Sequence, residues 1–382
     1  MVKKNKHMSE IQRSLRNLLS LEFWLCDMFN GTVEQGVMDN AKLSELGSKA
    51  KDHNLHKQEI EKLKKEDIMT NPYLSNIKVP RVSSNDFHLS NKRIIRPGYI
   101  TKYKCKSRDL KTLQQKNSYF TCDDSLRFPS LIEGDSNTCW MTVEPFEIES
   151  FRPFIEEASG NILLIGCGLG YAAYMLSEKE NVNSVTIIDN NQDVLDLFTN
   201  HLLPQFKNKN KINTIQGDGI KYLKENDLSI YNYVNVDIWY DTVDMIYQYL
   251  RCLEIEKANP EVNFSYWLEE ELKEQIQKTI IAAIANDGVP EKQKVEYVEE
   301  GFLSAIIGKD LVSKTTINNT EDIYNLLALD NFRDTMFEWY ANNLETTERQ
   351  EKEDLSMLKL SHHINSADMI SEKIFTKKPT FL

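Results

Sequence analysis

The feature that most constrains the fold is a regular alternation of apolar runs and helical segments between residues 162 and 236. Strands are predicted where apolar or β-branched residues run together, at 162–165, 184–188, 212–216 and 231–236. The segments between them predict helices, at 171–178, 193–203 and 220–225. Continuous apolar strands separated by helices are typical of a parallel sheet covered on both faces. The pattern therefore predicts an α/β domain built on a doubly wound, mostly parallel sheet.

The chain before this alternation predicts helices first and strands later. Apolar residues recur at helical spacing over 9–29, and a charged stretch rich in Ala, Leu, Lys and Glu predicts a second helix over 41–66. Between residues 77 and 140 the pattern changes to short β-prone runs broken by Pro, Gly, Asn and Asp, which predict a small antiparallel sheet. A helix over 145–158 then leads into the first strand of the α/β domain.

The chain after the alternation is predicted to be mostly helical. A helix is predicted over 242–257, a strand over 263–268 and a long helix from Glu269, and Asn319 is typical of a helix start. We therefore expect four regions: an N-terminal helical region (1–75), a small β-rich basic region (76–144), the α/β domain (145–290) and a helical C-terminal region (291–382).

Composition and short motifs exclude several classes of protein. No apolar run approaches the roughly 20 residues of a membrane-spanning helix. The Lys-rich N-terminus is followed by charged residues where a signal peptide would be apolar, so we expect a cytoplasmic protein. The six cysteines are dispersed without a C-x-x-C pair and are predicted to be reduced thiols. The histidine pairs at 53/56 and 362/363 lack cysteines or carboxylates at ligand spacing, so no metal site is predicted.

The charge is unevenly distributed along the chain. The net charge is −12, yet residues 76–120 hold eleven Lys and Arg residues against two Asp residues. A basic layer docked on the acidic remainder is the favoured interpretation. A nucleic-acid-binding surface is the alternative, because aromatic residues that could stack on bases stand among these charges, at Tyr99, Tyr103, Tyr119 and Phe120.

The residues that follow the first three strands have the chemistry of a nucleotide site. Ligands of open parallel sheets bind beyond the carboxyl ends of the strands. The loop Gly166-Cys167-Gly168-Leu169-Gly170 follows the first strand, and its glycines permit a tight turn and close approach of a ligand to the backbone. Asp189, next to Asn190, follows the second strand, where its carboxylate can accept both hydroxyl hydrogens of an adenosine ribose. Gly217-Asp218-Gly219 follows the third strand, and Asp218 is placed to accept a hydrogen bond from an exocyclic amine.

The fourth strand is followed by two acids and two aromatic residues, Asp237, Trp239, Tyr240 and Asp241. Each acid alone is typical of a helix N-cap or a turn. Four strand ends that carry such residues in chain order instead favour a nucleotide-cofactor site.

These residues resemble the class I S-adenosylmethionine (SAM)-dependent methyltransferases. Within that family the chain is similar to the spermidine-synthase-like branch, because Ile162-Leu163-Leu164-Ile165 lacks the usual acid of the first strand. The resemblance covers residues 161–241, about a fifth of the chain. It implies that the methionine part of SAM lies on Gly166, Cys167, Gly168 and Gly170, the ribose at Asp189 with Asn190, the adenine at Gly217-Asp218-Gly219, and the methionine amine or the acceptor at Asp237. NAD is the competing cofactor, but its fingerprint requires glycine where this chain has Tyr171.

Departures from the family pattern leave the acceptor open. Polyamine synthases carry an Asp in the loop where this chain has Leu169, and their Asp-Ser-Ser-Asp is replaced by residues 237–241. The Asn-Pro-Pro-Tyr motif typical of amide and exocyclic-amine methylation is missing. The favoured hypothesis is a SAM-dependent methyltransferase with a small-molecule acceptor. The alternatives are an aminopropyl transferase, an RNA methyltransferase that binds through residues 76–120, or a non-catalytic SAM- or nucleotide-binding module.

Methyl transfer is an in-line displacement at a sulfonium carbon, so the protein must orient the acceptor and remove a proton from a neutral one. Asp237 and Asp241 are the candidate bases, and Tyr240 is a further catalytic candidate. Trp239 is expected to line the substrate pocket, because aromatic faces suit a positive sulfonium. Glu144 is expected to close that pocket from above. The sequence does not indicate the oligomeric state.

Overall fold

The computed structural model describes residues 8–19, 59–98, 101–104, 106, 108–110, 113, 118–134, 138–239, 242–289, 294 and 302–354. The chain forms two compact units. The sheet unit comprises Glu22–Tyr240 and Arg251–Glu271. The helical unit comprises Met1–Leu21, Asp241–Leu250 and Leu272–Leu382. None of the described helices is both long enough and apolar enough to cross a membrane.

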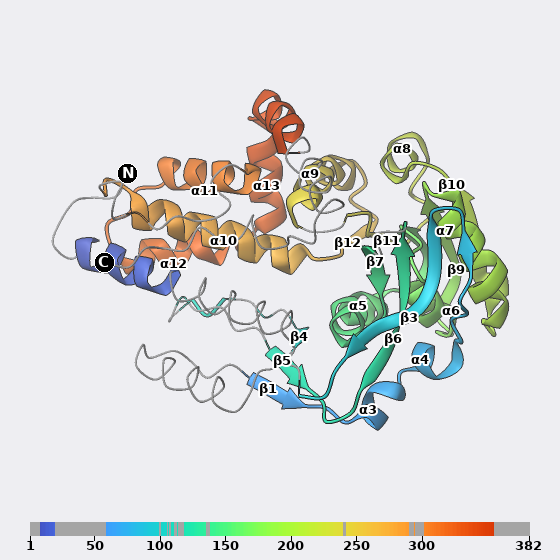
Figure 1. Cartoon of the computed structure of the whole chain (residues 1–382). Coiled ribbons are helices and arrows are strands. Elements are labelled where there is room, and N and C mark those ends of the chain that lie inside the picture. Colours follow the sequence, from blue (N-terminus) through green and yellow to red (C-terminus); the bar gives the residue numbers. More distant parts are fainter. Residues whose placement is uncertain are drawn as a thin grey trace. The chain divides into compact units, whose positions relative to one another are not determined.

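Five parallel strands form the centre of the sheet unit, in the order β10-β9-β8-β11-β12. Their bounds are Gly160–Ile165 (β8), Val182–Asp189 (β9), Ile212–Gln216 (β10), Tyr233–Val236 (β11) and Asn263–Tyr266 (β12). The chain runs outward from β8 to β10 and then returns to the other side of β8 with β11. In Figure 1, β9 and β10 lie at one side of this sheet and β11 and β12 at the other. This confirms the predicted doubly wound, mostly parallel sheet. The strand order reverses between β8 and β11, which is where such sheets bind ligands.

The helices that connect and flank these strands lie close to their predicted positions. They are α5 (Pro145–Glu157), α6 (Tyr171–Ser177), α7 (Gln192–Leu197) and α8 (Gly219–Glu225). The helix predicted over 193–203 is α-helical only as far as Leu197, and a π turn and a 3-10 turn continue it to Gln205. Apolar side chains of β8 and β9 pack with those of α5 and α6 in one core, with Ile162, Val185, Phe154 and Leu176 among them.

Two smaller sheets precede the parallel sheet. The first is antiparallel, with the order β2-β3-β6-β7 and the bounds Ser83–Ser84, Phe87–Ile95, Leu126–Glu133 and Thr138–Thr142. The second has the order β1-β5-β4, with the bounds Glu59–Lys62, Ser118–Thr121 and Thr101–Lys104. The predicted antiparallel pairing is confirmed, but it is divided between two sheets, and the second sheet is mixed because β1 pairs in parallel with β5. It also includes β6, which was not predicted because Pro129 interrupts its pattern.

Residues 59–62 show that the helix prediction over 41–66 was wrong at its C-terminal end. They form β1, which pairs in parallel with β5 from Glu59 opposite Ser118 to Lys62 opposite Thr121. The Glu-Ile-Glu-Lys segment has no strong β preference, so pairing with a distant strand decides its structure. Helices α3 (Lys65–Met69) and α4 (Pro72–Asn76) follow. Residues 41–58 of the predicted helix, and 20–29 of the preceding one, lie outside the described residues.

The basic region contacts acids of the same unit. Arg93 on β3 pairs with Glu144 at 2.8 Å, where α5 begins. On β4, Lys104 pairs with Glu149 at 3.1 Å, and Lys102 pairs with Glu271 at 3.4 Å. Three of the eleven basic residues of the segment 76–120 are therefore directed toward acidic residues that come later in the chain, which favours the docked-layer interpretation.

The helical unit contains residues 8–19, which form a helix as predicted, and the C-terminal helices. The latter are α11 (Leu303–Lys314), α12 (Thr320–Ala328), α13 (Phe332–Ala341) and residues 344–354. Helices α9 (Thr242–Ala258) and α10 (Glu269–Asn286) contribute residues to both units. Asn319 caps α12 in a capping box with Asp322, as its sequence predicted. The side chains of Gln12 and Arg16 donate to the carbonyl groups of Ile284 and Ala285 at the end of α10, which ties the first helix to this unit.

Candidate active site at the carboxyl ends of the parallel strands

The candidate site lies where β8 and β11 end side by side. The Asp237 N–H donates to the Ile165 carbonyl at 2.8 Å, which extends the pairing of these strands to their last residues. Gly166 follows β8 with a φ of +106°, and a Cβ there would overlap the Asp237 carbonyl oxygen. Glycine alone both adopts this positive φ readily and lacks the Cβ that would overlap. The glycine loop and Asp237 are therefore held in direct contact at the point where the strand order reverses.

Met141 of β7 covers the middle of the glycine loop. The Leu169 N–H donates to the Met141 Sδ at 3.2 Å, and a Cβ on Gly168 would overlap the same sulfur. A cavity of about 20 Å³ remains beside the loop, with Met141, Phe151, Cys167, Tyr171 and Asp237 among its lining residues. This volume holds about one water molecule, so a nucleotide could reach the loop only after the Met141 side chain moves.

Helix α4 fixes the other side of the loop. The Tyr73 hydroxyl, which is fully buried, donates to the Leu169 carbonyl at 2.6 Å. The Asn71 amide donates to the Tyr171 hydroxyl at 3.3 Å, where α6 begins. Burial raises the pKa of the Tyr73 hydroxyl, so it remains a donor at any physiological pH. These contacts from outside the α/β domain were not predicted, because no local pattern reports a pairing across almost 100 residues.

Asp189 contacts the glycine loop directly. Its Oδ2 accepts the Cys167 N–H at 2.9 Å, and its Oδ1 accepts the Asn191 N–H at 2.8 Å. Burial raises the pKa of this carboxyl, and the two N–H groups oppose that shift. Each oxygen keeps a second lone pair, so the carboxylate could still accept hydroxyl groups of a ligand.

The predicted adenine-side residues lie at the same edge of the sheet and are more open. The Gly217 N–H donates to the Asp189 carbonyl at 2.9 Å, while a Cβ added to Gly217 would meet nothing within 4 Å. Asp218 is exposed and caps α8 by accepting the Lys221 N–H at 2.9 Å. Asn190 is also exposed, and its carbonyl accepts the Gln216 amide at 3.4 Å. These residues leave open surface next to Asp189.

Two carboxyl groups of the sheet unit have raised pKa values: Asp237, which lines the small cavity beside the loop, and Glu147 on α5. Burial, together with the charge of Asp189, raises the pKa of Asp237 to about 7. Burial, followed by the charge of Asp237, raises the pKa of Glu147 well above its ordinary value. Glu147 was not predicted as a site residue. Its signal in the sequence was its position one turn before Phe151, on the face of α5 that is buried.

Other predicted residues have structural partners or lie outside the described residues. Glu144 accepts the Arg93 Nε–H at 2.8 Å and is not aimed at the loop cavity as an unpaired group. The Trp239 indole is buried and donates to the Trp267 carbonyl at 3.0 Å, so it packs within the unit and does not line the loop cavity. Tyr240 and Asp241 lie outside the described residues.

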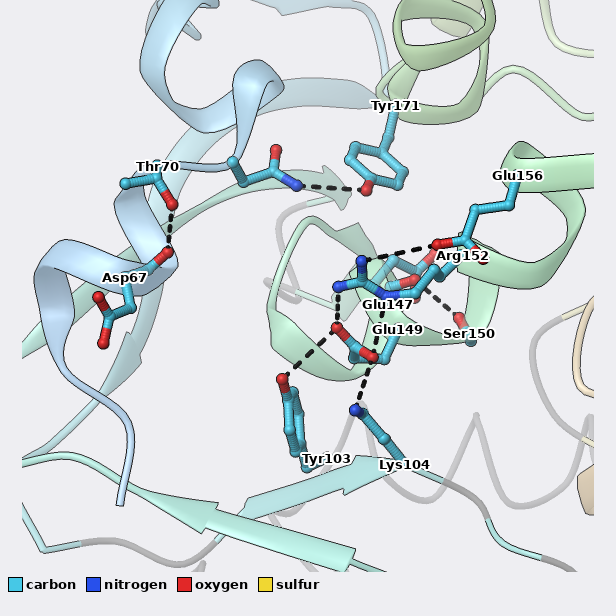
Figure 2. A network of polar contacts seen from close by, with 11 residues as sticks. Asp67, Thr70, Tyr103, Lys104, Glu147, Glu149, Ser150, Arg152, Glu156 and Tyr171 are labelled. Carbon is cyan, nitrogen blue, oxygen red and sulfur yellow. Dashed lines mark hydrogen bonds and ion pairs between the residues drawn. The ribbon is translucent and has the colours of Figure 1, made fainter. Parts of the chain in front are cut away.

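A larger cavity of about 380 Å³ lies between α3, α4 and the other face of α5. Figure 2 shows the network at its wall, which is centred on Glu149. The Glu149 carboxylate accepts from Lys104 at 3.1 Å, from Tyr103 at 3.5 Å and from the Arg152 guanidinium. Burial alone would raise the pKa of Glu149, but Arg152 and Lys104 lower it overall. Tyr171 lines both this cavity and the small one beside the glycine loop.

Comparisons with known proteins find similar solved structures but no protein of similar sequence among the family models and the curated proteins. Neither the models of known protein families nor the curated proteins contain a match to this chain. Among solved structures, it is similar to a candidate O-methyltransferase from Klebsiella pneumoniae, with 12% identity and a TM-score of 0.23 over 29% of this chain and 48% of that one. It is also similar to the Trypanosoma brucei PRMT1 enzyme–prozyme complex with AdoHcy, with 12% identity and a TM-score of 0.23 over 28% of this chain and 34% of that one. The chain thus spans less than half the length of either structure, and scores this low carry no argument about function.

Proposed function

We propose that this protein is a SAM-dependent methyltransferase whose acceptor is a small molecule. The observation that carries the proposal is the arrangement around the reversal point between β8 and β11. There the glycine loop, Asp189, Asp218 and Asp237 lie at or just beyond the ends of four strands, in a sheet whose order is that of a nucleotide-binding α/β domain. No described hydrogen bond or ion pair accounts for the Asp237 carboxylate, and open space faces Gly217.

The residues present fit this cofactor in chemistry. Asp189 would accept the two ribose hydroxyl groups with its remaining lone pairs, while its bonds to the Cys167 and Asn191 N–H groups keep it oriented. Asp218 would accept the adenine amine beside the open face of Gly217. Asp237 would neutralise a positive group at the loop. Bound SAM would supply an electrophilic methyl group, and the protein would orient an acceptor lone pair against it.

Ion pairs formed by the basic region support a small-molecule acceptor. Arg93, Lys102 and Lys104 form ion pairs within the sheet unit, so they are less available for phosphate groups. Weak, salt-independent association with RNA is expected. Steeply salt-dependent RNA binding would instead favour the RNA methyltransferase alternative.

Isothermal titration of the full chain with SAM tests the cofactor assignment. We expect binding that weakens at least tenfold in Asp189→Asn and in Asp218→Ala. Asp227→Ala is the matched control, because Asp227 is an exposed acid in the turn before β11, at the opposite end of the strand. Wild-type protein that does not bind SAM, or equal affinity in all three variants, would refute the assignment.

A further inference from the structure

The Glu149 carboxylate, at the wall of the cavity between α3, α4 and α5, is fully engaged by donors of the protein. Its Oε1 accepts from the Tyr103 hydroxyl at 3.5 Å and from Arg152 Nη2. Its Oε2 accepts from Arg152 Nε at 3.1 Å and from the Lys104 ammonium at 3.1 Å. A carboxylate has about four lone-pair sites, so these donors leave none for a ligand. Two cations surround one carboxylate, and the cluster therefore carries one positive charge in excess.

The Arg152 guanidinium keeps donors that Glu149 does not use. A guanidinium offers five N–H donors, and Arg152 gives Glu149 one from Nε and one from Nη2. Among the described residues, none accepts a hydrogen bond from Nη1. The Glu156 carboxylate approaches Nη1 only to 4.0 Å, beyond hydrogen-bond distance, and is 69% exposed. Because Arg152 lines the cavity, its remaining N–H groups are available to a ligand there.

Tyr171 adds a hydroxyl group to the same cavity wall. Its side chain is 2% exposed, and its oxygen accepts the Asn71 amide at 3.3 Å. In the described part of the chain, no group accepts the hydroxyl hydrogen in return. Figure 2 shows the hydroxyl pointing toward Arg152, which of all charged groups has the largest effect on the pKa of Tyr171. A guanidinium and a buried hydroxyl can therefore both donate to one ligand.

Apolar side chains form much of the remaining wall. Ile148 and Ile155 of α5 are buried and line the cavity, together with Ile68 of α3 and Met175 of α6. The volume of about 380 Å³ lies within the range of small-molecule sites, roughly 300–1,000 Å³. Arginine binds carboxylates well, because its planar fork matches their geometry. The cavity thus suits a ligand that has an apolar body and one carboxylate.

Two further acids line this cavity, but they do not contact the donors closely. Asp67 on α3 and Glu156 at the end of α5 are both exposed. Figure 2 shows the Asp67 carboxylate directed away from Arg152. Water screens the charges of exposed groups, whereas a ligand carboxylate would contact the Arg152 guanidinium directly. The direct contact therefore outweighs the repulsion from Asp67 and Glu156.

We propose that the cavity between α3, α4 and α5 binds a small carboxylate with an apolar body, whose oxygens accept hydrogen bonds from the Arg152 guanidinium and the Tyr171 hydroxyl. The inference goes beyond the proposed function and does not depend on it.

Three probes that share one apolar body test the charge preference of the cavity in the full chain. Hydrocinnamate is an anion at neutral pH, hydrocinnamamide has nearly the same shape without the charge, and phenylpropylamine is a cation. We expect NMR titration to show about fivefold tighter binding of hydrocinnamate than of the amide, because hydrogen bonds to a charged acceptor are stronger. Phenylpropylamine should bind most weakly of the three.

Protein labelled at the isoleucine δ1 methyl groups locates the bound probe. Hydrocinnamate should shift the methyl signals of Ile68, Ile148 and Ile155, which line the cavity. The signal of Ile215, which is exposed on β10, should not change.

Variants of the wall test the role of Arg152. Arg152→Gln should reduce the preference for hydrocinnamate over its amide to less than about twofold. Arg127→Gln, which removes an exposed arginine of β6, is the matched control and should retain the preference. Glu156→Gln removes the acid that faces Nη1 and should tighten hydrocinnamate binding about twofold. Because Glu156 is exposed, this variant also tests the site if Arg152→Gln does not fold.

Several outcomes would overturn the inference. Equal binding of hydrocinnamate and hydrocinnamamide, or tightest binding of phenylpropylamine, would mean that Arg152 does not select the ligand. Shifts confined to isoleucines outside the cavity would place the probe elsewhere. Weaker hydrocinnamate binding in Glu156→Gln would contradict the role given to Nη1. None of these measurements requires SAM, so failure of the proposed function would leave their result unchanged.

Discussion

Replacing Asp237 with Asn is expected to stabilise the folded protein while it abolishes function. The pKa of Asp237 rises from 3.8 to about 7, because burial and the charge of Asp189 disfavour the ionised form. The folded protein thus binds a proton more tightly than the unfolded chain does. The stability of the wild type must therefore fall as the pH rises from about 4 to about 7, and stay low above that.

The size of this effect follows from the two pKa values. A difference of about three pKa units corresponds to about 4 kcal/mol at pH 8, and to less than half of that at pH 5. The asparagine amide leaves its own polar atoms without partners in the same site, which offsets part of the gain. We expect a net stabilisation of about 2 kcal/mol at pH 8 and less than about 1 kcal/mol at pH 5. For a unit of this size, 2 kcal/mol corresponds to a rise in Tm of roughly 5 °C.

Thermal unfolding of the wild type and Asp237→Asn at both pH values is the assay. The control is Asp227→Asn, whose carboxylate is exposed, has a lowered pKa and accepts hydrogen bonds from Ser229. This control is expected to lose a little stability at pH 8. The reasoning would be refuted if Asp237→Asn had an equal or lower Tm at pH 8, or if its gain were the same at pH 5, since a gain independent of pH cannot come from a titrating carboxylate.

Three further changes test the surroundings of the site. Tyr73→Phe leaves the buried Leu169 carbonyl without its donor and should destabilise the protein by about 1–2 kcal/mol in denaturant titration; an unchanged midpoint would show that the loop does not depend on α4. Glu149→Gln should lower the free energy of unfolding by about 2 kcal/mol near pH 7 in denaturant titration. Because the pKa of Glu149 is lowered in the folded protein, this difference from the wild type should shrink as the pH falls below about 4. Met141→Ala removes the sulfur that covers Gly168 and should tighten SAM binding at least threefold by titration; weaker binding would mean that the thioether belongs to the cofactor site.

The parallel sheet could be predicted because each of its strands has a clear pattern in the local sequence. Residues 162–165 and 184–188 are continuous apolar runs, and a strand buried on both faces requires them whatever its neighbours are. Strand β1 is the opposite case, because its four residues become a strand only by pairing with β5, which lies almost 60 residues further along the chain. No local pattern contains that information. The same applies to β6, where Pro129 was tolerated within an antiparallel pairing with β3.

Local sequence also predicts some residues of the candidate site and not others. Asp189 and Asp237 could be placed because Asp189 ends its strand and Asp237 follows its strand directly, and the topology brings strand ends together. The contact of Met141 with the loop depends on β7, a strand of another sheet, so no local sequence pattern contains it. Glu147 lies one turn before Phe151 on the apolar face of the predicted helix, but its burial depends on how α5 packs.

The residues that carry the functional argument are those whose chemistry the fold does not require. Gly166 and Gly168 are needed for packing against Asp237 and Met141 with no ligand present, so their pattern alone indicates a tight turn. Gly217 fills no such role, since a side chain there would meet open space. Desolvation raises the pKa of Glu147 and of Asp237, so the fold disfavours the charged form of both groups. A chain selected for folding alone would lose such groups readily. Asp237 lies at the reversal point of the sheet, and a carboxyl group of raised pKa at such a point is typical of a functional site.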